Sequence, residues 1–109
     1  MTEDKVRESA GRILGFKDTE TAISGVGQIT SFNHLGFKGI KDRPDGWYLP
    51  NESSFPAIIL EAKSEKTTLK KPHIDELLKN TAIIETKYKK HIGLLYNGNI
   101  VQICKDGIF

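Results

Sequence analysis

The chain has 109 residues, 28% of them charged, and a formal net charge of +2, which allows one domain with a modest core over residues 1–109. Its single cysteine, Cys104, excludes a disulfide framework and a cysteine-based zinc cluster. No apolar run approaches the length of a membrane span and the amino terminus is charged rather than signal-like, so we expect a soluble, cytoplasmic protein without a membrane segment.

The first expected element is an amphipathic helix near the amino terminus. Val6, Ala10, Ile13 and Leu14 form its apolar stripe. Thr2 precedes this stripe and is a good N-cap residue. The pattern predicts a helix that packs through this stripe.

The following segment, from Glu20 to Ile29, is ambiguous between a second helix and a loop. It contains Gly25 and Gly27, and glycine destabilises a helix interior. The sequence leaves the two alternatives open.

Residues 46–60 read as a β-hairpin. Two apolar segments, 46–49 and 56–60, flank a stretch rich in turn formers. If the hairpin is symmetric about Ser53, paired residue numbers add to 106, so Asp45 lies opposite Glu61. Opposed residues of an antiparallel pair have Cα atoms roughly 4.5 to 5.5 Å apart.

The two carboxylates and a nearby lysine indicate a hydrolytic site. Lys63 is two residues beyond Glu61, so it shares the same face of the strand. Two facing carboxylates repel each other unless a cation neutralises them. An all-oxygen donor set favours Mg²⁺ or Mn²⁺ over Zn²⁺. The lysine would orient or help deprotonate the attacking water, or stabilise charge that develops on the phosphate. The pattern predicts metal-assisted hydrolysis of a phosphodiester.

A second helix is expected to begin near Pro72, and its apolar face should pack on the sheet. This face consists of Ile74, Leu77, Leu78, Thr81 and Ile84. Glu76 and Asn80 lie at its edge, where they can point toward the carboxylates. For Glu76, a favourable charge in the first helical turn is an equally good explanation.

The last expected element is a hairpin of two apolar strands, 92–96 and 100–104, around the tight-turn sequence Asn97-Gly98. The expected order is therefore helix, a helix or loop, strand, strand, helix, strand, strand. This order predicts an α/β fold with a mixed central sheet flanked by helices.

Lysines cluster beside the expected site. Lys66, Lys70 and Lys71 follow the second strand of the first hairpin. Such a basic rim would contact DNA phosphates without reading sequence. The net charge alone is too small to indicate nucleic-acid binding.

The motif Pro44-Asp45, a spacer, and Glu61-Ala62-Lys63 resembles the core signature of the PD-(D/E)XK nuclease superfamily. The resemblance implies a restriction-endonuclease-like core, metal binding by Asp45, Glu61 and the carbonyl of Ala62, and Lys63 as the catalytic lysine. It also implies an acidic residue upstream of the first catalytic strand. Glu20 is the preferred candidate for this acid, and Glu8 is the alternative. The simpler interpretation of Glu8 is that it is a solvated helix residue.

Within the superfamily, the layout is most similar to the amino-terminal nuclease region of type I restriction subunits and related restriction-modification proteins. Many of these proteins carry a Gln-x-x-x-Tyr motif on the next helix, thought to contact the site or the DNA. Here the matching positions are Glu76 and Asn80, which keep the spacing and change the chemistry. The resemblance implies double-stranded DNA as partner and further domains or subunits of a restriction complex, and we expect the chain to be a fragment of a longer protein.

Three functions are consistent with the sequence. The leading hypothesis is a Mg²⁺-dependent DNA endonuclease domain of a restriction system, with Mn²⁺ as a substitute. The alternatives are a catalytically inactive nuclease-fold module that binds DNA or a partner subunit, and a structural domain in which Asp45, Glu61 and Lys63 form a cross-strand ion pair.

Overall fold

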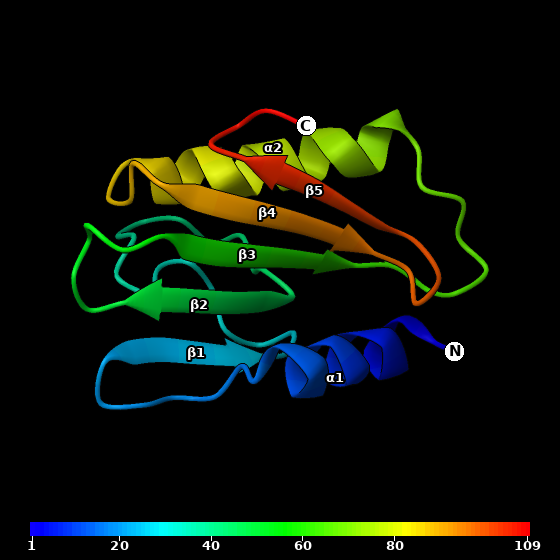
Figure 1. Cartoon of the computed structure of the whole chain (residues 1–109), viewed down its shortest axis with the longest axis horizontal. Helices are drawn as coiled ribbons and strands as arrows, with labels where there is room; N and C mark the ends of the chain where they lie inside the picture. Colours follow the sequence, from blue (N-terminus) through cyan, green and yellow to red (C-terminus); the bar gives the residue numbers. More distant parts are fainter.

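A five-stranded mixed sheet with one helix against each face forms the fold (Figure 1). The computed structural model describes residues 1–109. The elements are α1 (Glu3–Leu14), β1 (Ala22–Val26), β2 (Gly46–Pro50), β3 (Ala57–Ala62), α2 (Lys71–Glu85), β4 (His91–Tyr96) and β5 (Val101–Lys105). The expected α/β class with a mixed sheet and flanking helices is confirmed. No helix is long and apolar enough to cross a bilayer.

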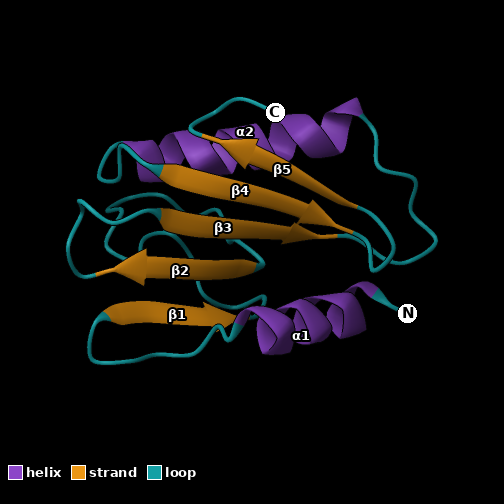
Figure 2. Cartoon of the chain, in the orientation of Figure 1, coloured by secondary structure: helices purple, strands orange, loops and turns teal.

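The strands lie in the order β1-β2-β3-β4-β5 (Figure 2). Only β3 and β4 are parallel, and α2 connects them; the other neighbours are antiparallel. Helix α2 runs antiparallel to β3, so its amino-terminal half lies near the carboxyl end of β3 (Figure 1). This end of the sheet also holds the start of β2 and therefore brings the predicted motif together.

The register predicted for the first hairpin is confirmed. Gly46 pairs with Leu60, Trp47 with Ile59 and Tyr48 with Ile58, so each pair of residue numbers adds to 106. The registered pairing stops at Gly46 and Leu60, because the backbone N–H of Asp45 donates to the carbonyl of Leu60 over 3.2 Å rather than to that of Glu61.

The core has two parts, because successive residues of β3 face opposite sides of the sheet. Ile59 faces α2 and belongs to a cluster with Trp47, Leu77 and Ile84. Phe32, Leu35 and Phe37, from the loop between β1 and β2, join the same cluster. Leu60 faces the other side and packs with Ala10 of α1 and with Phe16. The interior of β3 is thus covered on both faces.

Helix α1 is rotated relative to the predicted apolar stripe. Thr2 caps the helix as expected, and Val6 and Ala10 are buried. Ile13 and Leu14, however, are 73% and 40% exposed. The buried residues beside Val6 and Ala10 are Arg7 and Gly11. Gly11 packs on β1, where an added Cβ would lie 2.9 Å from a methyl group of Val26, so small size at this position decides the rotation.

The segment from Glu20 to Ile29 contains a strand rather than a helix, so a helical reading of this region is wrong. Strand β1 pairs with β2 along its whole length, from Ala22 opposite Pro50 to Val26 opposite Gly46. Gly25 fits because its α-carbon faces the ring of Trp47, where a Cβ would lie 3.0 Å away. Glycine disfavours a helix here, and pairing with β2 satisfies the backbone hydrogen bonds of this segment instead.

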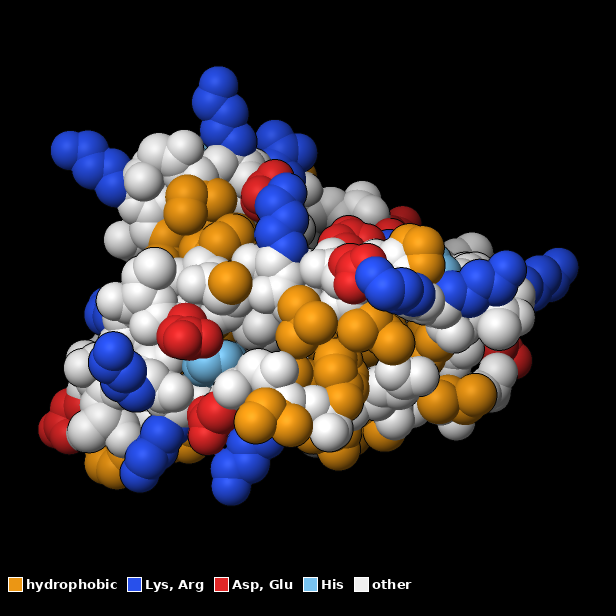
Figure 3. Space-filling model, turned by 90° about the horizontal axis from the view of Figure 1, so that it is seen from above, with side chains coloured by type: hydrophobic (Ala, Val, Ile, Leu, Met, Phe, Trp, Pro, Cys, Tyr) orange, Lys and Arg blue, Asp and Glu red, His pale blue; other side chains and the backbone are white.

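Strand β5 forms the other edge and leaves apolar side chains exposed. Val101 and Ile103 lie on the face that carries α1, and with Ile13 they line an apolar hollow of about 300 Å³. Figure 3, which looks onto this edge, shows hydrophobic side chains grouped between lysines and acids. Cys104 points to the opposite face and is buried.

Candidate active site

Asp45 and Glu61 meet at one end of the sheet, one just before β2 and the other near the end of β3. The Oδ2 atom of Asp45 accepts the backbone N–H of Ala62 over 2.8 Å. The side chain of Glu61 hydrogen-bonds to that of Asp45, and Glu61 is only 3% exposed. The predicted pair of facing carboxyl groups is therefore present, and the backbone of Ala62 contacts it.

Lys63 lies at the same end, directly after β3. Its ammonium group is 3.1 Å from Oε2 of Glu76 on α2. Burial alone would lower the pKa of Lys63, but the carboxylates of Glu76, Glu3 and Glu61 outweigh it and raise this pKa. Lys63 is therefore a cation at neutral pH, which suits stabilisation of negative charge and not proton abstraction.

The edge residues of α2 reach the carboxyl pair. The Nδ2 atom of Asn80 donates to Oε1 of Glu61, and Asn80 is buried. Glu76 holds Lys63 and lies close enough to influence the charge of Glu61. Both side chains thus point toward the site. The first-turn explanation of Glu76 is wrong, because α2 begins at Lys71 and has no acidic residue in its first turn.

Glu61 is uncharged at neutral pH in this arrangement. Burial, followed by the neighbouring charges of Asp45 and Glu76, raises the pKa of Glu61 to about 9, and Lys63 only partly opposes the rise. The proton on Glu61 is donated to Asp45, so the pair carries one negative charge. A proton therefore occupies the place between two carboxylates where a cation would neutralise both.

Arg7 is a further residue of this site that the sequence analysis does not predict. The Arg7 side chain is 5% exposed, and its Nε and Nη2 atoms lie 2.9 and 2.8 Å from Oδ1 of Asp45. Nη1 also contacts Asp4 over 2.7 Å and Nη2 contacts Glu3 over 3.1 Å. Burial lowers the pKa of Arg7, and these three carboxylates more than compensate by raising it. The one available signal is the spacing of Glu3 and Asp4 from Arg7, which also fits surface ion pairs.

Neither candidate for the upstream acid joins the site. Glu20 lies before β1, near the Pro50 end of β2, which is the opposite end of the sheet from Asp45. Its backbone carbonyl accepts the side chain of Asn51. The expected catalytic role of Glu20 therefore has no support in the geometry, because the direction of β1 places Glu20 at the far end of the sheet. The acid that α1 supplies beside Lys63 is Glu3.

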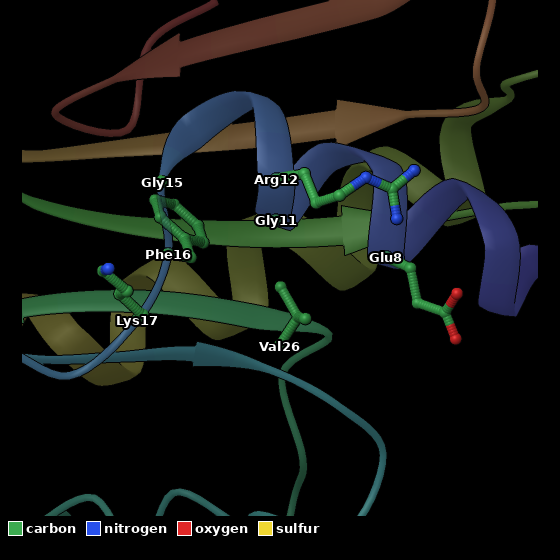
Figure 4. A pocket seen from close by; sticks show the side chains of 7 residues that line it. All are labelled: Glu8, Gly11, Arg12, Gly15, Phe16, Lys17 and Val26. Carbon is green, nitrogen blue, oxygen red and sulfur yellow. The ribbon is translucent and has the colours of Figure 1, made fainter.

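Glu8 is solvated, as its simpler reading held. Its carboxylate is 3.8 Å from the ammonium of Lys5, and both side chains are more than half exposed. Glu8 borders a hollow of about 540 Å³ beside α1, together with Arg12 and Lys17 (Figure 4). None of the residues that line this hollow belongs to the carboxyl pair or to its contacts. The largest hollow is therefore separate from the candidate site.

The three candidate DNA-contacting lysines lie on the loop after β3 and at the start of α2. Lys66, Lys70 and Lys71 are exposed. Lys71 pairs with Asp75 over 2.9 Å, and the backbone N–H of Lys70 donates to Nδ1 of His73 at the helix start. The lysines flank the end of the sheet that carries Asp45 and Glu61, although the carboxyl groups themselves are largely buried.

The donor set fits a hard divalent cation by its chemistry. The carboxyl groups of Asp45, just before β2, and of Glu61, in β3, supply only oxygen atoms, whereas the contact that Ala62 makes with the pair is through its N–H. No three His, Cys, Asp or Glu side chains are grouped as a metal-binding cluster, and Mg²⁺ commonly takes only one or two carboxylates and keeps its waters. With Glu61 protonated, the charges of Asp45 and Glu76 are matched by those of Arg7 and Lys63, so a bound cation would have to replace the shared proton or one of these partners.

Comparison with known proteins gave no relatives. No family model matches the chain, and neither a curated protein nor a solved structure is similar to it.

Proposed function

We propose that this domain is a Mg²⁺-dependent nuclease that hydrolyses phosphodiester bonds of double-stranded DNA. The observation that carries the proposal is the meeting of Asp45 and Glu61 on adjacent strands, with Lys63 at the same end of the sheet. This arrangement agrees with the PD-(D/E)XK signature and with a restriction-endonuclease-like core. The chemistry needs acidic metal ligands and a positively charged side chain at one place. The fold brings Asp45, Glu61 and Lys63 to the same end of the sheet.

Each side chain has a role in the proposed site. Asp45, Glu61 and the carbonyl of Ala62 would hold the cation, which when bound supplies Lewis-acid activation of water and neutralises phosphate charge. Lys63 is cationic and stabilises negative charge that develops on the phosphate. Asn80 orients Glu61 through its hydrogen bond, and Glu76 orients Lys63.

DNA would approach the open end of the sheet across the exposed lysines. Lys66, Lys70 and Lys71 would bind backbone phosphates, which gives affinity without sequence preference. Replacing all three by glutamine should reduce the salt dependence of DNA binding, with a slope of log K against log[salt] lower by about 2 to 3. An unchanged slope would place the DNA elsewhere on the surface.

The assignment to a restriction system rests on the resemblance of the motif and layout to type I restriction subunits and related proteins. In such a system the domain would act in the cytoplasm, beside further domains or subunits that supply DNA recognition or translocation. Cleavage by the isolated domain could therefore depend on those further domains or subunits, whereas metal binding depends on the domain alone. Metal binding is the more direct test.

The test is calorimetric titration of Mn²⁺ into the wild type and the variants Asp45→Asn and Glu61→Gln, which preserve side-chain shape. Asp42→Asn is the matched control, because Asp42 is an acid of the same segment that pairs with Lys79 outside the site. We expect binding in the wild type and the control, and loss of binding in both site variants. A wild type that binds no Mn²⁺, or site variants that bind as the wild type does, would refute the metal site.

Cleavage of plasmid DNA with Mg²⁺ or Mn²⁺ completes the test. Lys63→Gln should retain the cation and lose cleavage, because the lysine acts on the phosphate and binds no metal. Cleavage by this variant at the wild-type rate would contradict the role of Lys63.

The second candidate is a nuclease-fold module without catalysis, which binds DNA or a partner subunit. The ion pair between Arg7 and Asp45 favours it, because a buried guanidinium already satisfies one ligand oxygen. In that case the wild type would bind DNA with the same affinity in EDTA and in Mg²⁺, and no variant of Asp45 or Glu61 would change this affinity.

A further inference from the structure

Arg7 has no part in the nuclease chemistry proposed above, although it is the only buried arginine of α1 and contacts a proposed metal ligand. A charged group is costly to bury unless it is paired. Here the pairing is complete, since all three guanidinium nitrogens contact carboxylates. The rotation of α1 that buries Arg7 also leaves Ile13 exposed, so the helix packs with the arginine inward and an isoleucine outward.

Arg7 contacts one oxygen of Asp45 through two of its nitrogen atoms. Oδ2 of Asp45 is held by the backbone N–H of Ala62, and Oδ1 receives both Nε and Nη2 of Arg7. Each oxygen of this carboxylate thus has a donor. A divalent cation that binds Asp45 has to share an oxygen with Arg7 or with the N–H of Ala62, and of these two donors only the Arg7 side chain can move without a change in the strand.

Arg7 also has a second place to go. Glu3 and Asp4 stand four and three positions before it on α1, and both already contact its guanidinium. A small shift of the side chain would exchange the contact with Asp45 for closer contacts with these two acids, with no change in the helix. Arginine cannot lose its proton at accessible pH, so movement is the only way in which it can yield Asp45.

We propose that Arg7 is an internal counter-cation that competes with the divalent metal for Asp45, so that metal binding releases Arg7 toward Glu3 and Asp4. This inference rests on the proposed function. It makes α1 part of the metal site: the helix lowers the affinity for the cation and responds when the cation binds.

The first test is calorimetry of Mn²⁺ binding to Arg7→Met and Arg7→Lys, with Arg12→Met as the control on the exposed side of the same helix. Removing a positive charge within a few ångströms of the cation should tighten binding on the order of tenfold or more in Arg7→Met. Arg7→Lys, which keeps the charge, and Arg12→Met should bind as the wild type does. A merely structural arginine would instead weaken binding when it is lost.

The second test needs no variant and decides the matter if Arg7→Met does not fold. In the ¹⁵N spectrum of the wild type, the hydrogen-bonded Nε–H of Arg7 should shift as Mg²⁺ is added, with the same midpoint as metal binding. An unchanged signal at saturating Mg²⁺, or equal or weaker Mn²⁺ affinity in folded Arg7→Met, would overturn the inference and leave the metal site standing. Absence of Mn²⁺ binding in both the wild type and Arg7→Met would refute the proposed function itself.

Discussion

Replacing Glu61 by glutamine should stabilise the protein, although Glu61 is a proposed metal ligand. In the absence of a cation the buried carboxyl group is protonated and donates to Asp45. Glutamine has the same shape and the same hydrogen-bonding pattern, because its carbonyl can accept from Asn80 and its amide can donate to Asp45. The variant therefore mimics the protonated state and does not have to take up a proton when it folds.

The size of the effect follows from the pKa of Glu61, which rises from 4.5 to about 9 on folding. Between these values the folded state binds a proton that the unfolded state lacks, so the free energy of unfolding decreases as the pH rises. The slope is about 1.4 kcal/mol per pH unit. At pH 7 the loss relative to pH 4.5 is about 3 kcal/mol for the wild type, and glutamine removes this loss.

The assay is urea denaturation between pH 5 and 9 in EDTA, followed by the fluorescence of the buried Trp47. The other ionisable groups are present in both proteins and cancel in the difference. We expect the Glu61→Gln curve to diverge upward from the wild type as the pH rises, whereas the exposed control Glu52→Gln should follow the wild type. Parallel curves for the wild type and Glu61→Gln would refute a shared proton in the Asp45–Glu61 pair.

Three further predictions concern the same fold. Gly93→Ala should lower the free energy of unfolding by about 1 to 3 kcal/mol, because the added Cβ would lie 2.8 Å from Cγ2 of Thr81 on α2; unchanged stability in urea denaturation would show that α2 can move away. Tyr88→Phe should cost about 1 to 2 kcal/mol in the same assay, because it leaves the buried carbonyl of Pro50 without its 2.5 Å hydrogen bond. Mg²⁺ should raise the melting temperature of the wild type and not that of Asp45→Asn, and an equal rise in both would indicate binding elsewhere.

The first hairpin could be predicted from the sequence because its information is local. The turn formers fix the centre of symmetry near Ser53, and the register then follows from counting residues, which brings Asp45 and Glu61 to the same end of the hairpin. The helix after Pro72 and the Asn97-Gly98 hairpin are likewise determined by neighbours in the chain. These elements supply the carboxyl pair, Lys63 and the contacts from α2, which form most of the candidate site.

Strand β1 could not be predicted in the same way, because its pairing is not local. A loop of 19 residues, 27–45, separates β1 from β2, so the sequence gives no turn from which to count a register. Ile23 is largely exposed on this edge strand, which weakens the alternation that marks a buried strand. The misplacement of Glu20 follows directly, since its distance from Asp45 depends on the direction in which β1 runs.

The rotation of α1 shows why Arg7 was missed. Hydrophobic periodicity predicts that Ile13 and Leu14 are buried and that Arg7 is exposed, which is the usual pattern of an amphipathic helix. The partner that reverses the preference is Asp45, 38 positions away in the chain. Charge balance gives a clue that periodicity lacks: an expected pair of strand-end carboxylates with a single lysine is left negative, and the fold must supply a second cation from some element. An arginine preceded by two acids, at three and four positions before it, is suited to this role, because the same acids can hold it when a metal takes its place.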